Sequence, residues 1–329
     1  MDDVENGKTL GWIGTGRMGV VLVARLLRAG CDVAVYNRTA SKAEPLTALG
    51  AKIVETPADL AERDIVVTMV SSSEDLLEVV DGPQGLLSRS PPHPGLLVDC
   101  TTVSVEGAAE VRRRAERAGM QMLAAPVSGN PKVARAGRLS LVASGPREGF
   151  EAAAPYLRLL GTGVTYVGEG EASRLVKICH NLFLGVVAQS LAEITILAER
   201  GGVARADLLR FINDSVMGSV FSRYKTPAFV NLDFTPTFTS ELLRKDLELG
   251  LEAGRTYDVP LRVAGLVHQI VTELIEAGYG DQDFASLLEL EASRAGFELR
   301  SEDREVDDGL SPLDDLARRA AEEDQRKGV

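Results

Sequence analysis

Three glycines near the amino terminus have the spacing Gly-x-Gly-x-x-Gly, in the segment Gly14-Thr15-Gly16-Arg17-Met18-Gly19. The segment follows a strand-like apolar stretch and opens a stretch of helical periodicity, which is the context that a dinucleotide-binding loop requires. Gly14 would make the tight turn, Gly16 would let the backbone approach a pyrophosphate, and Gly19 would let helix and strand pack closely. The amino terminus of the helix would present free N–H groups to the phosphates. The flanking strand and helix disfavour the alternative, which is three glycines in an unrelated loop.

The end of the next predicted strand bears on the ribose of the cofactor. Enzymes that use NAD usually carry Asp or Glu there, which binds the ribose hydroxyls. This chain has Tyr36-Asn37-Arg38-Thr39 instead, followed by Ser41 and Lys42. Arg38 can hydrogen-bond a 2′-phosphate through its planar guanidinium, and Thr39 and Lys42 would add donors. We therefore expect NADP(H) to be preferred, with NAD(H) also possible. The alternative is that Arg38 is an ordinary solvated arginine.

A lysine and an asparagine four residues apart, Lys177 and Asn181, could serve the reduction of a carbonyl group. Delivery of a hydride leaves negative charge on the oxygen, which needs a proton or a fixed cation. Of the three histidines, His93 lies in a Pro-rich loop and His268 inside a late helical segment. Lys177 is thus a natural proton donor, and Asn181 shares its helix face and could bind substrate oxygen. Taken alone, Lys177 could also be a surface lysine.

Alternating strands and helices must position these residues. Apolar strand-like segments are expected at 10–14, 32–36, 64–70, 96–99, 120–124, 139–144 and 164–167, and helices at 18–29, 41–49, 75–80, 105–118 and 148–160. Strands that are apolar along nearly their whole length predict a parallel sheet covered on both faces, hence a doubly wound α/β Rossmann domain over 8–170. Ligands bind at the carboxyl ends of such strands, which places Val70, Ser71 and Thr102 beside the nicotinamide.

The sequence changes character after Gly170 and predicts helices only. One helix of about 28 residues is expected at 173–200, about 42 Å long, and others at 204–213, 240–256 and 261–277. These segments predict an all-α domain over 171–298 that binds the substrate. Helices with so much apolar surface often bury it against another subunit, so a homodimer or homotetramer is expected. The charged segment 299–329 is expected to be a mobile tail with one marginal helix at 313–324.

The overall composition excludes several classes of protein. The net charge of −12 argues against a general nucleic-acid binder, which needs a basic face. The three cysteines, Cys31, Cys100 and Cys179, lack metal-ligand spacing, so we expect free thiols in a reducing compartment and no metal site. The polar amino terminus and the absence of an uninterrupted apolar run of about 20 residues predict a cytoplasmic protein with no membrane span.

Several motifs, taken together, resemble the β-hydroxyacid dehydrogenase family, which includes 3-hydroxyisobutyrate dehydrogenase and tartronate semialdehyde reductase. The motifs are, in order, LGWIGTGRMG through VYNRT, Asp99-Cys100-Thr101-Thr102, Pro126-Val127-Ser128-Gly129, Gly168 and Gly170 before Lys177-Ile178-Cys179-His180-Asn181, Lys245-Asp246, and Asp281-Gln282-Asp283-Phe284. Each motif alone is loose, but their order and spacing over roughly 10–296 are specific. The resemblance implies a fold like that of 6-phosphogluconate dehydrogenase, with a Rossmann domain and an all-α domain.

The resemblance also implies roles for individual residues. Lys177 matches the catalytic lysine of the family. Ser128 and the backbone at Gly129 would hold a substrate carboxylate. Lys245 would close over the cofactor or substrate, unless it is an exposed helical lysine paired with an acid. His180 stands where the family often has Asn, and it could either contact the substrate or line the helix.

The chain departs from the family pattern at three positions around the substrate loop. Asn130 replaces the second glycine of Ser-Gly-Gly, Ala124 stands where an Asp is usual, and Val133 replaces a common glycine. Asn130 would add a side chain to the substrate-binding loop and make the pocket smaller or more polar. These departures bear on the identity of the acid, not on the cofactor loop or on Lys177.

The leading hypothesis is an NADP-dependent oxidoreductase that interconverts a short-chain 3-hydroxy acid, or a related hydroxy acid, and its aldehyde or keto form. Lys177 would be the general acid in reduction and the general base in oxidation, and the partner would be a small carboxylated substrate. Imine reductases resemble this fold but typically carry Asp or Tyr in place of the lysine. A non-catalytic cofactor-binding scaffold is the third possibility, and Lys177 argues against both alternatives.

Overall fold

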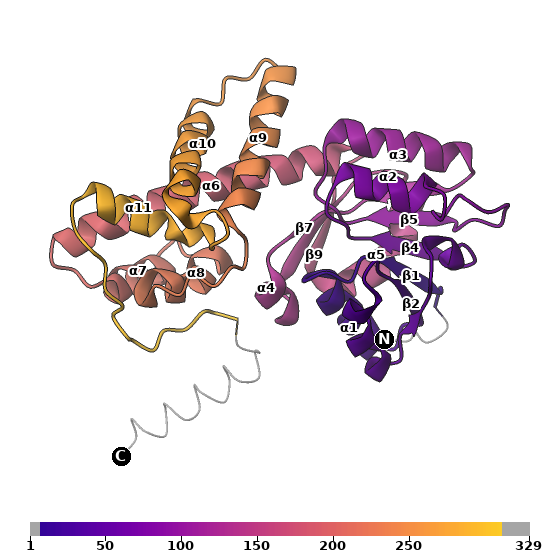
Figure 1. Cartoon of the computed structure of the whole chain (residues 1–329), viewed down its shortest axis with the longest axis horizontal. Helices are drawn as coiled ribbons and strands as arrows, with labels where there is room; N and C mark the ends of the chain where they lie inside the picture. Colours follow the sequence, from indigo (N-terminus) through magenta and orange to yellow (C-terminus); the bar gives the residue numbers. More distant parts are fainter. Residues whose placement is uncertain (1–6, 311–329) are drawn as a thin grey trace. The chain divides into compact units, whose positions relative to one another are not determined.

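The chain forms two compact units, one extending to Lys177 and one beginning at Ile178 (Figure 1). The computed structural model describes residues 7–310. The boundary falls inside the long helix α6 (Ala172–Arg200) rather than after Gly170, where the sequence predicted it. The reason is local, because the first turn of α6 makes its hydrogen bonds to the sheet of the first unit.

The first unit is built on a six-stranded parallel sheet with the strand order β3-β2-β1-β4-β5-β6. The strands are β1 (Leu10–Ile13), β2 (Val33–Tyr36), β3 (Lys52–Ile53), β4 (Ile65–Thr68), β5 (Leu96–Asp99) and β6 (Gln121–Ala124). Strands β1, β4 and β5 are buried along their whole length, as strands covered on both faces must be. The strand order reverses between β1 and β4, which confirms the doubly wound sheet.

Helices cover both faces of this sheet. On one face, α2 (Ser73–Asp81) and α3 (Val105–Arg117) bury Leu76 and Val111 against strand residues such as Val66. On the other face lie α1 (Gly19–Arg28) and α5 (Arg147–Leu160). The segment 41–49 is not the single helix that was expected. It forms two short 3₁₀ helices, Ala40–Lys42 and Glu44–Leu49, and Pro45 at the start of the second one lacks the N–H that a continuous helix would use.

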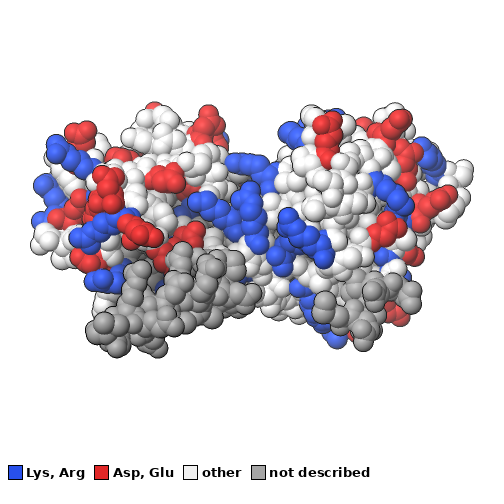
Figure 2. Space-filling model, turned by 90° about the horizontal axis from the view of Figure 1, so that it is seen from below, with Lys and Arg blue, Asp and Glu red and all other residues white. Residues whose placement is uncertain are grey.

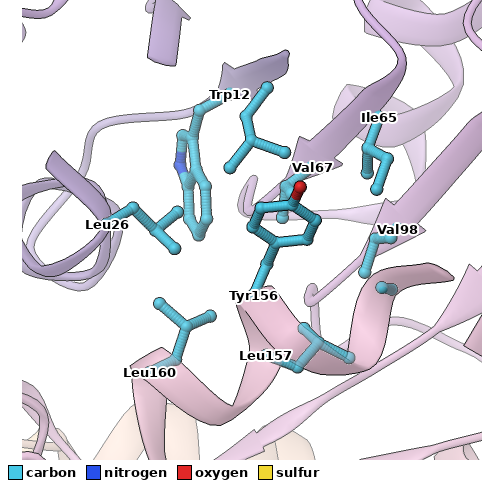
Figure 3. A pocket seen from close by; sticks show the side chains of 10 residues that line it. Trp12, Leu26, Ile65, Val67, Val98, Tyr156, Leu157 and Leu160 are labelled. Carbon is cyan, nitrogen blue, oxygen red and sulfur yellow. The ribbon is translucent and has the colours of Figure 1, made fainter. Parts of the chain in front are cut away.

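The core beneath α5 contains a small apolar cavity (Figure 3). Trp12, Val67 and Val98 project from the sheet toward Tyr156 and Leu157 of α5. The cavity has a volume of about 10 Å³. That is room for at most one water, and the lining offers no exposed polar surface to bind it. The cavity is therefore part of the hydrophobic core and not a ligand site.

A second, three-stranded sheet carries the predicted substrate loop. It contains β7 (Val127–Ser128), β8 (Leu139–Ala143) and β9 (Gly161–Tyr166), with β7 antiparallel and β9 parallel to β8. The short helix α4 (Pro131–Arg135) follows β7. The strands β8 and β9 were expected, but β7 and α4 were not, because two and five residues are too few to show periodicity.

The second unit is all-helical, as predicted. After α6 come α7 (Arg205–Asp214), α8 (Val220–Asn231), α9 (Ser240–Thr256), α10 (Arg262–Leu274) and α11 (Leu287–Arg294), with a π-helical turn at Ile275–Tyr279 and a 3₁₀ turn at Phe284–Ser286. These helices enclose a core of Leu, Ile, Val and Phe side chains. The helix α8 was not predicted, and Pro227 inside it explains why its sequence does not read as helical.

The charged segment from 299 makes specific contacts with the helical unit over the part that the structure describes, and its expected mobility stays a prediction. The carboxylate of Glu302 accepts hydrogen bonds from the backbone N–H groups of Arg205 (2.6 Å) and Ala206 (3.1 Å) at the start of α7. Asn231 and Arg304 are joined by two further hydrogen bonds. An acidic side chain is stabilised at a helix amino terminus, which explains how a charged segment binds there. The marginal helix expected at 313–324 lies outside the described residues.

Helix α6 is the one described helix that is long and apolar enough to cross a membrane by length and composition. Its mean hydropathy reaches 1.6 over 18 residues, and 44% of that window is buried inside the structure. The core helix of a globular protein meets the same criteria, so the expected absence of a membrane span stays a prediction. Figure 2 shows acidic side chains among the basic ones on the displayed face of each unit.

A buried ion pair between Lys225 of α8 and Asp283 holds the helical unit together. Thr237 adds two hydrogen bonds to the Asp283 carboxylate, from its backbone N–H (2.9 Å) and its hydroxyl (2.7 Å). Burial alone would raise the pKa of Asp283, but the Lys225 ammonium and these donors lower it below its usual value. A carboxyl whose pKa is lower in the folded state stabilises the fold above its unfolded pKa and loses that contribution as the pH falls through the folded pKa.

We predict that Asp283→Asn lowers the free energy of unfolding at pH 7 by about 3–5 kcal/mol, because it leaves the Lys225 ammonium buried without its counter-ion. The difference from the parent should begin to shrink as the pH falls below about 4, where the carboxyl of the unfolded chain takes up a proton, and should shrink further as the pH approaches the lower pKa of the folded state. Urea unfolding followed by circular dichroism at pH 7 and pH 3 measures both. The exposed neighbour Asp281→Asn is the control and should change stability by less than about 0.5 kcal/mol. Equal losses in the two variants at pH 7 would contradict this account.

Candidate functional site

The glycine loop leads from β1 into α1 and needs its glycines for different reasons. Gly14 has φ +99°, and a Cβ on it would lie 2.2 Å from the carbonyl oxygen of Met69. A Cβ on Gly19 would lie 2.0 Å from the carbonyl oxygen of Gly14. Gly16 is exposed, and no atom lies within 4 Å of the place its Cβ would take. Gly14 and Gly19 thus shape the turn, while Gly16 leaves an open face on which a pyrophosphate fits.

Asn37 joins this loop to the end of β2. Its Oδ1 accepts a hydrogen bond from the backbone N–H of Thr15 (2.8 Å), and its Nδ2 donates to the carbonyl of Thr39 (2.8 Å). Both ends of the amide are used, so the structure gives Asn37 a role in holding the two loops together. The Thr15 hydroxyl is buried and has no hydrogen-bond partner in the protein. Such an atom fits a loop that receives a polar ligand.

Arg38, which follows β2, forms an ion pair with Asp75 of α2. The Arg38 side chain is 83% exposed, and its Nη1 lies 3.0 Å from Oδ1 of Asp75 in the first turn of α2. The residues that follow β2 include no carboxylate, but the fold brings the Asp75 carboxylate of α2 to Arg38. An exposed ion pair is weak, so a phosphate can compete for the Arg38 guanidinium.

Other residues that were predicted to bind the cofactor lie in the glycine loop and after β4 and β5. Arg17 is exposed and Met18 is half-buried, both in the glycine loop. Val70 follows β4, and its backbone N–H donates to the Thr101 hydroxyl after β5 (3.1 Å). That hydrogen bond brings the segments of Val70, Ser71 and Thr102 to one edge of the sheet, which is the edge expected to face the nicotinamide.

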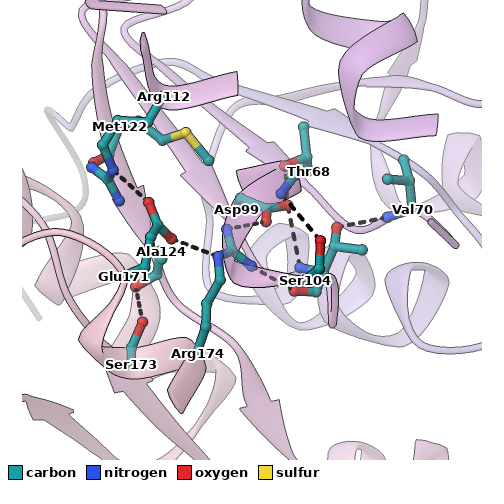
Figure 4. Close-up of polar contacts among 12 residues, drawn as sticks. Thr68, Val70, Asp99, Ser104, Arg112, Met122, Ala124, Glu171, Ser173 and Arg174 are labelled. Carbon is teal, nitrogen blue, oxygen red and sulfur yellow. Dashed lines mark hydrogen bonds and ion pairs between the residues drawn. The ribbon is translucent and has the colours of Figure 1, made fainter. Parts of the chain in front are cut away.

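The carboxyl ends of β4 and β5 and the first turn of α6 share a buried polar network (Figure 4). Asp99 is fully buried and accepts from the Thr68 hydroxyl (2.6 Å) and from Nη2 of Arg174 (2.7 Å). Glu171 accepts from Nε of Arg174 (2.6 Å) and from Nε of Arg112 (2.6 Å). Two arginines and two carboxylates therefore alternate in the network, which is how buried charges are tolerated.

Burial shifts the pKa values of groups in this network. Burial alone would lower the pKa of Arg174, but Asp99 and Glu171 raise it above its usual value, so the guanidinium stays charged. Burial and the Asp99 charge also raise the pKa of the Cys100 thiol far above its usual value. A protonated, buried thiol is neither a nucleophile nor a metal ligand. Residues 7–310 contain no group of three or more His, Cys, Asp or Glu side chains that could hold a metal ion.

The substrate loop places Ser128 at the end of β7 and Asn130 at the start of α4. Gly129 between them has φ +129°, and a Cβ there would lie 2.5 Å from the Leu139 side chain. Asn130 is 4% exposed, and its Oδ1 accepts from the backbone N–H groups of Lys132 (2.9 Å) and Val133 (3.0 Å). The departure from glycine thus caps α4. The Asn130 Nδ2 is buried and has no hydrogen-bond partner in the protein.

The other two departures are also buried. Ala124 ends β6, and its carbonyl oxygen accepts from the backbone N–H of Ser144 and from the hydroxyl of Ser173. The Val133 side chain lies against the backbone of Gly129. Both residues therefore support the loop from behind, where their apolar character suits the core.

Helix α6 carries Lys177 and Asn181 one turn apart. Lys177 is 9% exposed, which argues against the surface-lysine alternative. The Nδ2 of Asn181 donates to Oδ2 of Asp246 on α9 (2.6 Å), and the His180 ring nitrogen Nδ1 lies 2.9 Å from the Asn181 Oδ1. The Lys245 side chain is 42% exposed, with its Nζ 3.7 Å from Asp246. Asp246 therefore contacts both Asn181 and Lys245, two residues that were predicted to belong to the site. The sequence indicated Asp246 itself only as part of the Lys245-Asp246 motif.

Two protein-family models match the chain and meet at residue 168, close to the boundary of the two units after Lys177. Residues 9–168 match the family model described as the NAD-binding domain of 6-phosphogluconate dehydrogenase. Residues 168–290 match the model described as the NAD-binding domain of NADP-dependent 3-hydroxyisobutyrate dehydrogenase. Both models describe domains that bind a pyridine nucleotide, and the glycine loop lies within the residues that the first one matches.

Curated relatives match over most of their length. The chain is 28% identical to glyoxylate/succinic semialdehyde reductase 2 of Arabidopsis thaliana, over 85% of this chain and 78% of the relative. It is 30% identical to a probable 3-hydroxyisobutyrate dehydrogenase of Dictyostelium discoideum, over 85% of this chain and 89% of the relative.

Solved structures of a 3-hydroxyisobutyrate dehydrogenase and of an imine reductase are also similar to this chain. The structure of 3-hydroxyisobutyrate dehydrogenase from Mycobacterium tuberculosis with L-serine is similar, with a TM-score of 0.74 and 28% identity over 86% of this chain and 99% of that one. An imine reductase from Myxococcus stipitatus in complex with NADP⁺ also matches, with a TM-score of 0.53 and 27% identity over 85% of this chain and 99% of that one.

We predict that Gly16→Ala and Gly19→Ala fail in different ways. The methyl group of Gly16→Ala points into open space, so the melting temperature should stay near that of the parent. Its dinucleotide affinity should fall by at least about tenfold, or about 1.4 kcal/mol. Gly19→Ala forces a Cβ onto the Gly14 carbonyl and should lower stability by about 1–3 kcal/mol. Thermal melts and cofactor titrations of both variants test this. Unchanged affinity in Gly16→Ala would show that the pyrophosphate lies elsewhere.

Proposed function

The chain belongs to the β-hydroxyacid dehydrogenase family, and we propose that it reduces and re-forms a short-chain aldehyde or keto acid with NADP(H), with Lys177 as the acid–base group. As a member of the family it is an oxidoreductase of the hydroxyacid type that binds NAD(P). The preference for NADP(H), the substrate and the role of Lys177 are the proposal. The observation that carries it is a buried lysine on α6, one helical turn from a buried asparagine.

Lys177 would manage the proton of the reaction. The nicotinamide, when bound, supplies or accepts the hydride. The Lys177 ammonium would donate a proton to the substrate oxygen during reduction, and the neutral amine would remove it during oxidation. A buried position suits this task, because a donor in a site that excludes water interacts more strongly with the developing charge.

Asn181 would bind the same oxygen with an orientation that Asp246 sets. An amide nitrogen carries two hydrogens. One of them is directed at the Asp246 carboxylate, so the amide cannot rotate to exchange its nitrogen and oxygen. The second N–H can then donate to the substrate. His180 lies against the Asn181 amide oxygen, which favours a supporting role over a direct substrate contact.

The substrate loop supports a carboxylated substrate. The Asn130 Nδ2 is a buried donor with no partner in the protein, and leaving such a donor unsatisfied costs about 1–3 kcal/mol. A substrate carboxylate held by Ser128, the Gly129 backbone and Asn130 would satisfy it. The relatives are named for glyoxylate, succinic semialdehyde and 3-hydroxyisobutyrate, and one similar structure contains L-serine. All of these molecules carry a carboxylate.

Arg38 supports the preference for NADP(H). Its exposed guanidinium follows β2, where the ribose 2′ position is expected, and Asp75 holds it in place. Binding of a 2′-phosphate would exchange this weak ion pair for a charge-assisted hydrogen bond. Asp75 opposes the phosphate through its own charge, so we expect a preference for NADP(H) rather than exclusion of NAD(H).

We further propose that the protein forms a homodimer or homotetramer through the helical unit and acts in the cytoplasm. The helical unit exposes several large apolar side chains, which favours burial against a second copy: Phe183, Leu197, Phe211, Val216, Met217 and Leu266. Light scattering on the purified protein measures the oligomeric state. The retained Lys177 continues to argue against an imine reductase and against a non-catalytic scaffold.

We predict that Lys177→Met abolishes turnover while the cofactor still binds. The test is oxidation or formation of NADPH and NADH at 340 nm with glyoxylate, succinic semialdehyde and 3-hydroxyisobutyrate. The parent should turn over at least one of these, faster with the phosphorylated cofactor. In Lys177→Met the rate should fall by about 10²–10⁴, the usual value of general acid–base catalysis. Lys52→Met, at an exposed lysine on β3, is the control and should keep the parent rate. Turnover within a few fold of the parent in Lys177→Met would refute the assignment.

Arg38→Ala should weaken the binding of NADPH much more than that of NADH. Loss of a charge-assisted hydrogen bond should raise the Kd for NADPH about tenfold or more. The Kd for NADH should change by less than about threefold, since exposed charges alone contribute little. Trp12 is the only tryptophan, and its Nε1 donates to the carbonyl of Gly14 (2.9 Å), so its fluorescence can report binding. Arg158→Ala, at an exposed arginine of α5, is the control. Equal losses for both cofactors would contradict a role at the 2′-phosphate.

A further inference from the structure

We propose that Arg174 is a positioning residue for the reaction, which couples the strand ends beside the nicotinamide to the helix that carries Lys177. Arg174 lies in the first turn of α6 and is 2% exposed. The inference deepens the proposed function and rests on the acid–base role of Lys177 in it. The buried ionic network around Arg174 has no part in the cofactor binding or the proton transfer proposed above, and this inference gives it a role.

All three guanidinium nitrogens of Arg174 are engaged within the first unit. Nε donates to Glu171 (2.6 Å), Nη1 donates to the carbonyl oxygen of Thr101 (3.0 Å), and Nη2 donates to Asp99 (2.7 Å). Each nitrogen of this buried side chain is thus directed at an acceptor of the protein itself. We therefore assign Arg174 an effect on the reaction that passes through these neighbours and not a direct contact with the substrate.

Asp99 and Thr101 extend the network to the cofactor side. Asp99 Oδ1 accepts from the Thr68 hydroxyl (2.6 Å) at the end of β4 and from the backbone N–H of Thr101 (3.2 Å) after β5. The Thr101 hydroxyl accepts in turn from the backbone N–H of Val70 (3.1 Å). Arg174 thus holds the two segments that lead to Val70, Ser71 and Thr102. These are the residues expected beside the nicotinamide.

The same network fixes the start of α6. Ser173 donates to the carbonyl oxygen of Ala124 (3.2 Å), and its hydroxyl also accepts from Ser144 (2.8 Å). Glu171, just before the helix, is held by Arg112 (2.6 Å). With Arg174, these contacts attach the first turn to the sheet at several points around the helix. The turn can neither slide nor rotate about the helix axis without breaking buried hydrogen bonds.

Helix geometry transmits this constraint to Lys177. Lys177 lies three residues after Arg174, which is a rise of about 4.5 Å and a rotation of about 60° from the same face. The direction in which Lys177 leaves the helix is therefore set by Arg174. A displacement of about 1 Å in a reacting group can cost a factor of about 10² in rate. A network that fixes both the strand ends and the helix thus controls the alignment of cofactor and proton donor.

The test compares three proteins: the parent, Arg174→Met, and the double variant Asp99→Asn with Arg174→Met. In Arg174→Met the Asp99 carboxylate is buried without its counter-ion, so the melting temperature should fall. The double variant removes both charges and should recover much of that stability. In both variants we expect kcat to fall by about 10²-fold, because the helix start is no longer fixed. The Kd for NADPH, from Trp12 fluorescence, should stay within about threefold of the parent, since the glycine loop is untouched.

One further readout and a control variant separate an effect on positioning from an effect on stability. The solvent deuterium isotope effect on kcat should increase in both variants, because a misplaced donor makes proton transfer slower. The control is Arg205→Lys, which alters a fully buried arginine of the helical unit that pairs with Glu199. It should lower the melting temperature and leave kcat and the isotope effect at parent values below its melting transition.

The inference is overturned if kcat recovers together with stability in the double variant, or if Arg174→Met keeps kcat within threefold of the parent. If Arg174→Met does not fold, the double variant alone decides the question by the same criteria. Failure of the proposed function has a different signature, which is retained turnover in Lys177→Met. Normal rates in the Arg174 variants together with an inactive Lys177→Met would refute only the positioning role.

Discussion

The buried ion pair between Asp99 and Arg174 is the constraint on which the arrangement of the first unit depends. A charged side chain removed from water needs a counter-ion, so the carboxyl end of β5 and the first turn of α6 cannot separate without exposing a charge to an apolar interior. This requirement explains why the boundary between the two units falls after Lys177 and not before α6. The lysine proposed for proton transfer is thereby attached to the unit that binds the cofactor.

The cofactor side of the site combines local and distant contributions. Gly14 and Gly19 must be glycines because a Cβ at either position would clash with a nearby backbone carbonyl. Because these glycines lie close together in the chain, their spacing is visible in the sequence as a motif. The ion pair joins Arg38, which follows β2, to Asp75 of α2, and no local sequence motif reveals it. The balance between these two charges, and not Arg38 alone, is what we expect to set the preference at the ribose 2′ position.

The sequence predicted those helices and strands whose apolar residues recur at regular spacing. The buried parallel strands, the long helices and the all-α second unit follow from apolar spacing, and the structure has them with bounds shifted by a few residues. It did not predict β7 and α4, which are too short, or α8, which contains Pro227. Nor could it predict Asp246 as the partner of Asn181, because their bond joins residues far apart in the chain. The role of Lys177 came from the chemistry of carbonyl reduction and from motif order, and the roles of Ser128 and Asn130 came from motif order. All three roles stay predictions.

The most direct test of the account is a crystal structure of the protein with NADP⁺ and the hydroxy acid that it oxidises fastest. The measured quantity is the distance from the Lys177 Nζ to the hydroxyl oxygen of the bound acid. The account predicts a hydrogen-bond distance of about 2.6–3.2 Å, the range expected of a general acid–base group. A hydroxyl oxygen bound to another titratable side chain, with the Lys177 amine directed away from it, would contradict the central claim.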